Sequence, residues 1–223
     1  MIDSPAMTAN DYFVDDVADV TPKHGTSVQS GWDLAASVLD KPAAGEYPTD
    51  FRFSESTQLV RFLEDDPFDV YAQHWIEREG KKSFVCHQTP RIDESCPLCD
   101  IAGDQPRNKF AFNVVVLTDE NDGTPKVQIL TAPPSFARQL RAMNMDPKMG
   151  PLSKHYWAIA RHGSGPKTQY TLNRVKATDL AEEWDLDPAA VEASLQNLPL
   201  YDSSVTYVTP REELLDIARA LVS

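Results

Sequence analysis

The chain has 223 residues, of which 41% are hydrophobic, enough to bury the core of one domain with appendages or of two small domains. No run approaches the roughly 20 apolar residues of a membrane-spanning helix. The acidic N-terminal stretch also lacks the apolar core of a signal peptide. We therefore expect a cytoplasmic protein with no membrane partner.

The net charge of −13 is unevenly distributed along the chain. Residues 1–50 carry 9 acids and 2 bases (−7), residues 51–178 carry 15 acids and 17 bases (+2), and residues 179–223 carry 10 acids and 2 bases (−8). A mildly basic middle segment thus lies between two acidic ends. Such ends can simply aid solubility, or they can compete with nucleic-acid phosphates for the basic surface.

Residues 1–50 are rich in small and polar residues and predict a largely disordered segment with one short helix over 32–39. From Phe51 onward the apolar pattern predicts short strands. They cover residues 58–63, 70–76, 83–87, 109–118, 126–130, 155–161 and 169–175. In the strand over 109–118, one face carries Phe110, Phe112, Val114 and Val116, and Asn121-Asp122-Gly123 predicts a hairpin turn after it.

Two helices complete the predicted elements. One begins at Pro134 and places Phe136, Leu140 and Met143 on one side. The other begins at a capping box, Thr209-Pro210-Arg211-Glu212, and its apolar side carries Leu214, Leu215, Ile217, Ala218 and Leu221.

Together these elements predict a mainly β (α+β) fold. Its body, residues 51–178, is expected to form a small, partly open Greek-key barrel of the OB type, although other small barrels fit the same strand count. An inserted metal-binding subdomain is expected at about 69–105, and residues 179–223 form an acidic helical segment.

Three cysteines lie within 14 residues of one another, which in a cytoplasmic chain indicates a metal site rather than a disulfide framework. Cys96-Pro97-Leu98-Cys99 is a C-x2-C knuckle, and Cys86 supplies a third thiolate. Zinc takes four tetrahedral nitrogen and sulfur ligands. The fourth ligand is therefore expected to be a nearby histidine, His74 or His87.

Strand geometry favours His74. If Glu79-Gly80-Lys81 forms a three-residue hairpin loop, paired residue numbers sum to 160, and His74 lies directly opposite Cys86 with Cβ atoms about 5 Å apart. His87 then points to the other face. A two-residue loop would pair His74 with Val85 and favour His87 instead, so the choice depends on the loop.

Four protein ligands would close the coordination shell, so we expect one structural zinc ion and no catalysis. Thiol redox chemistry is the rival interpretation of the C-x2-C motif. It requires a βαβ context, whereas the surrounding residues predict strands and a third cysteine is left unexplained.

His74 followed by Cys86-x9-Cys96-x2-Cys99 resembles the zinc site of the single-stranded DNA-binding proteins of T-even bacteriophages, in which a zinc subdomain is inserted into an OB fold. The run over residues 61–100 is similar to zinc-containing single-stranded DNA-binding proteins of tailed phages of actinobacteria. The resemblance covers about residues 58–175. It implies sequence-independent coating of single strands during phage DNA replication, recombination and repair. The T-even protein has a basic N-terminal segment for cooperative assembly, whereas residues 1–50 are acidic here.

Non-specific single-strand binding needs cations for the backbone and aromatic faces for the bases. In the register above, Ala72, His74, Ile76, Phe84 and Cys86 share the metal face. The other face carries the stacking candidates Tyr71 and Trp75, with the phosphate-binding candidates Arg78, Lys81 and Lys82 at the hairpin tip. A second hairpin supplies Tyr156, Trp157, Arg161, Lys167, Tyr170 and Arg174.

Two other classes of function remain open. The first is a zinc-stabilised protein-interaction or transcription adaptor, and replication or recombination proteins could also meet the acidic ends of a DNA-binding protein. The second is an enzyme such as a nuclease. No Walker loop, nucleophile motif or second cluster of His, Asp and Glu supports it.

Overall fold

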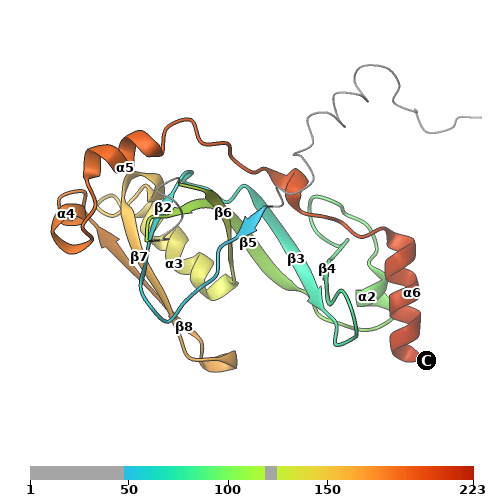
Figure 1. Cartoon of the computed structure of the whole chain (residues 1–223). Helices are drawn as coiled ribbons and strands as arrows, with labels where there is room; N and C mark the ends of the chain where they lie inside the picture. The colour runs from blue at the N-terminus through green and yellow to red at the C-terminus, as the bar shows by residue number, and fades with distance from the viewer. Residues whose placement is uncertain (1–47, 119–124) are drawn as a thin grey trace, which may run out of the picture. The chain divides into compact units, whose positions relative to one another are not determined.

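The computed structural model describes residues 48–118 and 125–223 (Figure 1). The helix predicted over 32–39 and the turn predicted at Asn121-Asp122-Gly123 lie outside these residues. The strands are β1 (Thr49–Asp50), β2 (Gln58–Phe62), β3 (Asp69–Trp75), β4 (Ser83–Val85), β5 (Arg107–Val116), β6 (Val127–Ala132), β7 (Tyr156–His162) and β8 (Gln169–Val175). The α-helices are α2 (Pro97–Asp100), α3 (Pro134–Met145), α4 (Asp179–Glu183), α5 (Pro188–Ser194) and α6 (Arg211–Val222). Each of the seven predicted strands overlaps an observed one.

The strands form one eight-stranded sheet in the order β1-β6-β5-β2-β7-β8, and β3 joins it by pairing with β5 and β4. The long strand β5 pairs with β2 near its C-terminal end and with β3 along its N-terminal half, as in the pair Val70↔Phe110. The predicted barrel is not confirmed, because the sheet is not closed. Strand β1 pairs in parallel with β6 and so occupies the edge that a closing strand would need.

The main core lies between the sheet and α3. Phe112, Val114 and Val116 alternate along β5 and pack with Phe136 and Leu140 of α3, as their spacing predicts. Phe110 and Met143 lie at the margin of this core. Because α3 covers this face of the sheet, the helix and β5 are fixed relative to each other.

The acidic segment over 179–223 is folded onto the sheet and the metal-binding hairpin. Leu180 of α4 and Val191 of α5 pack against Tyr156 and Ala158 on β7. The chain then runs back past the sheet to α6, which lies beside α2 (Figure 1). The helical C-terminus predicted from the sequence is therefore present, and α6 buries Leu214, Ile217 and Ala218 while Leu221 is exposed.

The start of α6 differs from the prediction. Pro210 is the N-cap, and no side chain caps the helix, so the predicted capping box does not form. Thr209 is fully buried instead, and its hydroxyl accepts a hydrogen bond from Lys81 Nζ at 2.8 Å. A tertiary contact has thus replaced the local cap that the four-residue motif predicts.

Candidate metal centre and outer sheet face

The hairpin of β3 and β4 has a register two residues away from the predicted one. Its pairs are Gln73↔Val85, His74↔Phe84 and Trp75↔Ser83, so paired numbers sum to 158 rather than 160. The backbone N–H of Ile76 donates to Lys82 O, which leaves a five-residue loop over 77–81. A shift of two residues keeps every side chain on its face. His74 and Cys86 therefore still share a face, as diagonal neighbours rather than as a direct pair.

Four side chains converge on this face. His74 comes from β3, Cys86 follows β4, and Cys96 and Cys99 lie at the start and within the short helix α2. Their ligand atoms all lie within 4.8 Å of one another, and His74, Cys86 and Cys96 are buried. The four residues are thus close enough to hold one metal ion.

The distances between these atoms fit a tetrahedral centre. Cys86 Sγ lies 3.6 Å from Cys99 Sγ. His74 Nε2 lies 3.4 Å from Cys96 Sγ and 3.6 Å from Cys99 Sγ. A tetrahedral ion with metal–sulfur bonds near 2.3 Å and metal–nitrogen bonds near 2.0 Å requires separations of about 3.8 Å and about 3.5 Å, respectively.

Asp104, which the sequence analysis did not identify, orients the histidine. Its Oδ2 lies 2.7 Å from His74 Nδ1, so the Nδ1–H donates to the carboxylate and Nε2 is left facing the thiols. Such carboxylate–histidine pairs fix the tautomer of a metal ligand. Gly103, with φ of +66°, turns the chain after α2 so that Asp104 faces His74.

The thiols titrate unequally. Burial opposes ionisation of Cys96, but hydrogen bonds from His74 and from three backbone N–H groups lower its pKa to about 6. Burial raises the pKa of Cys86 and of Cys99, and the nearby charge of Cys96 raises both further, whereas the hydrogen bond with Cys99 lowers that of Cys86. Three thiolates at this spacing therefore need a cation, since a bound metal ion stabilises the deprotonated form of each.

His87, the alternative ligand, is held elsewhere. It is buried on the opposite face, and its Nε2–H donates to Thr209 O at 2.8 Å. Its Nδ1 lies 3.7 Å from Glu94 Oε2. His87 thus fastens the segment before α6 to the hairpin.

Helix α6 forms part of the wall around the metal-binding residues. Leu214, Ile217 and Ala218 pack in one cluster with Cys86 and Cys96. Leu98 of α2 is also in this cluster. The C-terminal helix therefore belongs to the same structural unit as the four ligands, a connection that the spacing of the cysteines does not reveal.

The face of the sheet opposite the metal ligands carries an exposed aromatic ring beside two cations. Trp75 is 64% exposed. Across the ladder, Gln73 pairs with Arg107 and Tyr71 with Lys109, so the two cations share the face of Trp75. Burial and the nearby charge of Arg107 lower the pKa of Lys109. We call Tyr71, Trp75, Arg107 and Lys109 the outer face.

The DNA-binding candidates predicted around the hairpin of β3 and β4 differ in how exposed and how free of protein contacts they are. Tyr71 is half-buried. Burial raises its pKa, and a hydrogen bond with Thr131 offsets only part of this increase. Arg78 is exposed at the loop. Lys81 binds Thr209 and lies 4.4 Å from the ring centre of Tyr207, and Lys82 pairs with Glu77 at 3.1 Å.

The second hairpin does not supply the predicted stacking residues. Trp157 is fully buried in the main core and donates its Nε1–H to Leu152 O, and Tyr156 is buried with its hydroxyl donating to Glu192. Neither ring is available for stacking in this structure: Trp157 faces the main core, and α4 and α5 cover the opposite face of β7, on which Tyr156 lies. Tyr170 packs on Phe53 and Phe136, Arg161 is half-buried, and Arg174 donates to Lys148 O, whereas Lys167 is exposed.

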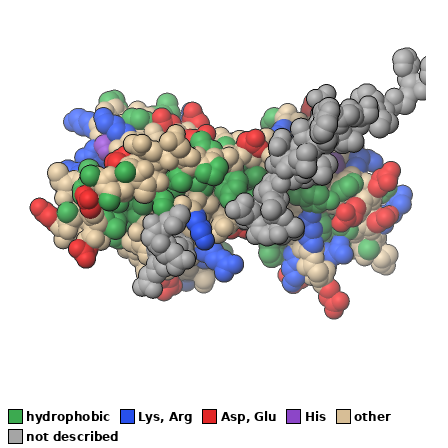
Figure 2. Space-filling model, turned by 45° about the horizontal axis from the view of Figure 1, so that its top comes forward, with side chains coloured by type: hydrophobic (Ala, Val, Ile, Leu, Met, Phe, Trp, Pro, Cys, Tyr) green, Lys and Arg blue, Asp and Glu red, His purple; other side chains and the backbone are tan. Residues whose placement is uncertain are grey.

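Arg107 and Lys109 were missed by the sequence analysis. Lys109 begins a predicted strand and Arg107 lies two residues before it, and only the pairing of β3 with β5 places both on the face of Trp75. On the face of the molecule in Figure 2, Lys and Arg side chains lie in separate groups with Asp and Glu between them. The basic residues therefore do not form a continuous stripe in this view.

Comparisons with known proteins identify no family for the chain. A scan against protein-family models finds no matching model, and a search of curated proteins finds no match. Among residues 48–118 and 125–223, no helix combines the length and the apolar character that crossing a bilayer requires.

Proposed function

We propose that this chain is a zinc-stabilised protein that binds single-stranded DNA without sequence preference and without catalysis. The zinc part rests on the donor set of one imidazole and three sulfur atoms. Soft thiolate ligands in a tetrahedral set select zinc over magnesium or calcium, which take oxygen ligands. With four protein ligands, no position is left for a reactive water, so the ion has a structural role.

The role of the chain's own residues is then to fix the hairpin. Asp104 holds the His74 tautomer, backbone N–H groups stabilise the Cys96 thiolate, and α6 shields the sulfur atoms from water. A bound zinc ion would add cross-links between β3, β4 and α2. Elemental analysis of purified protein tests this, with one zinc per chain expected. Metal-free protein that unfolds cooperatively would contradict it.

The observation that carries the DNA-binding proposal is the outer face. Trp75 is 64% exposed, and hydration of such a large apolar ring is unfavourable. The pairing of β3 with β5 places Arg107 and Lys109 on the same face as this ring. Bases can stack on the indole while the cations contact phosphates, and every base has a face to stack. The resemblance to phage proteins would place this activity in DNA replication, recombination and repair.

The test is a titration of fluorescently labelled oligo-dT against the zinc-loaded protein over a range of salt concentrations. Affinity should fall steeply with salt, since cations released from phosphates drive non-specific binding. Trp75→Ala should weaken binding by about 1–3 kcal/mol, and Trp75→Phe, which keeps a stacking ring, should retain most of the affinity. Salt-independent binding, or equal affinity of all three proteins, would exclude the outer face.

A second candidate function is a zinc-stabilised interaction adaptor. The observation that favours it is the exposed acidic side of α6, which carries Glu212, Glu213 and Asp216 on a helix whose apolar side is already used. An adaptor would show no steep salt-dependent affinity for oligo-dT, so the same titration separates the two functions.

A further inference from the structure

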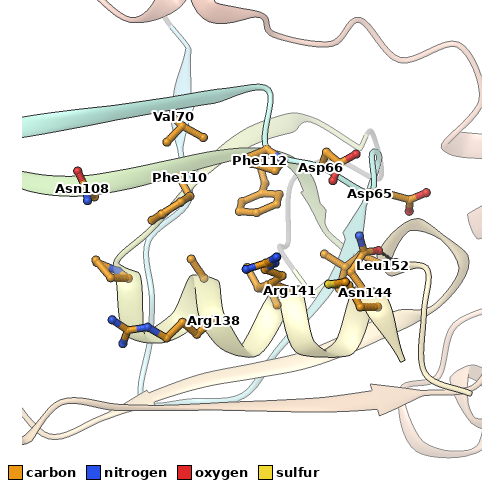
Figure 3. Close-up of a pocket in the computed structure, with 15 residues that line it drawn as sticks. Asp65, Asp66, Val70, Asn108, Phe110, Phe112, Arg138, Arg141, Asn144 and Leu152 are labelled. Atoms are coloured by element: carbon orange, nitrogen blue, oxygen red, sulfur yellow. Dashed lines mark hydrogen bonds between the residues drawn. The ribbon is translucent and has the colours of Figure 1, made fainter. Parts of the chain in front are cut away.

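A cleft lies between α3 and the inner side of the β3–β5 ladder, on the opposite face of that ladder from Trp75 (Figure 3). Its volume is about 480 Å³, within the range of small-ligand sites. Phe110 and Phe112 point from β5 toward α3 and form much of its wall. Val70 and Met145, which are 46% and 68% exposed, lie at its edge. The cleft is thus apolar within and open to solvent.

Two arginines line the cleft, and neither has a partner among the residues that the structure describes. Arg138 and Arg141 are three residues apart on α3 and therefore share a side of the helix. Within residues 48–118 and 125–223, neither forms an ion pair or a hydrogen bond. No acidic residue occurs between Pro134 and Met145 to balance them. Two like charges at this spacing repel each other, a cost that a bound anion removes.

Four other polar residues line the cleft, two aspartates and two asparagines. Asp65 accepts a hydrogen bond from Ser153 N at 2.9 Å, and Asp66 is exposed; Figure 3 places both at the end of the cleft away from Arg138. Asn144 Oδ1 accepts from Leu152 N at 3.0 Å. Asn108 is exposed at the other end, and within residues 48–118 and 125–223 its side-chain amide has no hydrogen-bond partner.

The ligand that matches this arrangement has a flat, largely apolar ring and a neighbouring anion. We propose that the cleft holds one unpaired nucleotide of a bound single strand, with its base against Phe110 and its phosphates on Arg138 and Arg141. Guanidinium groups recognise phosphate through paired hydrogen bonds, and Asn108 can bond the edge of the base. This inference rests on the proposed DNA-binding function and adds a site that excludes duplex DNA, because a paired base cannot enter.

Strand β5 connects this cleft with the outer face. Its alternating side chains direct Arg107 and Lys109 to the outer face and Asn108 and Phe110 to the cleft. A strand that passes the N-terminal end of β5 can therefore meet both surfaces. The two surfaces are separable by mutation, because they share no side chain.

The experiment compares three forms of the full-length, zinc-loaded protein: wild type, Arg138→Ala/Arg141→Ala, and the charge-matched control Lys176→Ala/Arg219→Ala, whose residues lie outside the cleft. Oligo-dT affinity should fall at least about tenfold in the first variant and little in the control. The slope of log affinity against log salt should decrease by about 1.4, or about 0.7 for each lost phosphate contact. An oligonucleotide with one 5-iododeoxyuridine should cross-link to Phe110 on irradiation, and the cross-link should disappear in Phe110→Leu.

Unchanged affinity and slope in Arg138→Ala/Arg141→Ala, with Trp75→Ala still impaired, would overturn the cleft site and leave the proposed function intact. The cleft would then be assigned to another class of ligand, such as a peptide. If wild-type protein does not bind oligo-dT at all, the proposed function fails and this inference fails with it. Loss of affinity equal to that of the control would show a general charge effect and would also overturn the site.

Discussion

Asp104→Ala is expected to weaken zinc binding although it removes no ligand. Loss of a carboxylate partner of a metal-bound histidine typically lowers affinity by about 10- to 100-fold. The Asp104 side chain is 32% exposed, so water can replace it as the acceptor of the His74 Nδ1–H. We therefore expect the lower end of this range, about tenfold or about 1.4 kcal/mol. Asp104→Asn keeps an acceptor oxygen and should lose less.

The assay is a competition titration against a chromogenic zinc chelator at fixed pH. The control is Asp100→Ala, which removes an exposed carboxylate of the same subdomain that binds Gln88 rather than a ligand. Cobalt(II) spectra of Asp104→Ala should keep the bands of a tetrahedral thiolate site, since the four ligands are unchanged. Wild-type affinity in Asp104→Ala, or an equal loss in Asp100→Ala, would refute the positioning role.

Two further predictions test the metal centre and its cover. His74→Ala should lower zinc affinity far more than His87→Ala, because only His74 faces the thiols; the same chelator competition decides, and a larger loss in His87→Ala would exchange their roles. Leu214→Ala, at a fully buried site of α6, should lower the free energy of unfolding by about 2–5 kcal/mol. Leu221→Ala, on an exposed part of the same helix, should change it by about 0.5 kcal/mol or less in the same urea titration. Equal effects would show that α6 does not stabilise the metal-binding subdomain.

The sequence predicted the strands, α3 and the faces of the hairpin because each depends on a local period. A period of two survives an error of two residues in register, so His74 and Cys86 were placed on one face although the loop was predicted two residues too short. Loop length itself depended on contacts from elsewhere. Lys81 binds Thr209, which lies 128 residues later in the chain.

Burial of β7 shows where local reasoning fails. Alternation assigns one face of a strand to the core and the other to solvent, but Tyr156 and Trp157 are both buried, because a later segment covers the second face. Leu180 and Val191 make that cover, and they lie in a stretch whose acidic composition suggested a tail. Asp104 was missed for a related reason, since one carboxylate among many gives no periodic signal.

The acidic C-terminal segment is folded onto the rest of the protein, and this limits its ability to compete with DNA. A tethered polyanion can compete with DNA only if it is free to leave the protein. Here α4 and α5 cover β7, Tyr201 N donates to Asn113 Oδ1, and α6 packs beside the metal ligands. Deletion from Asp179 would expose these surfaces and destabilise the metal-binding subdomain, so it cannot isolate electrostatic competition. Neutral substitutions of exposed acids such as Glu212 and Glu213 leave the buried contacts in place. They therefore separate the charge of this segment from its structural role.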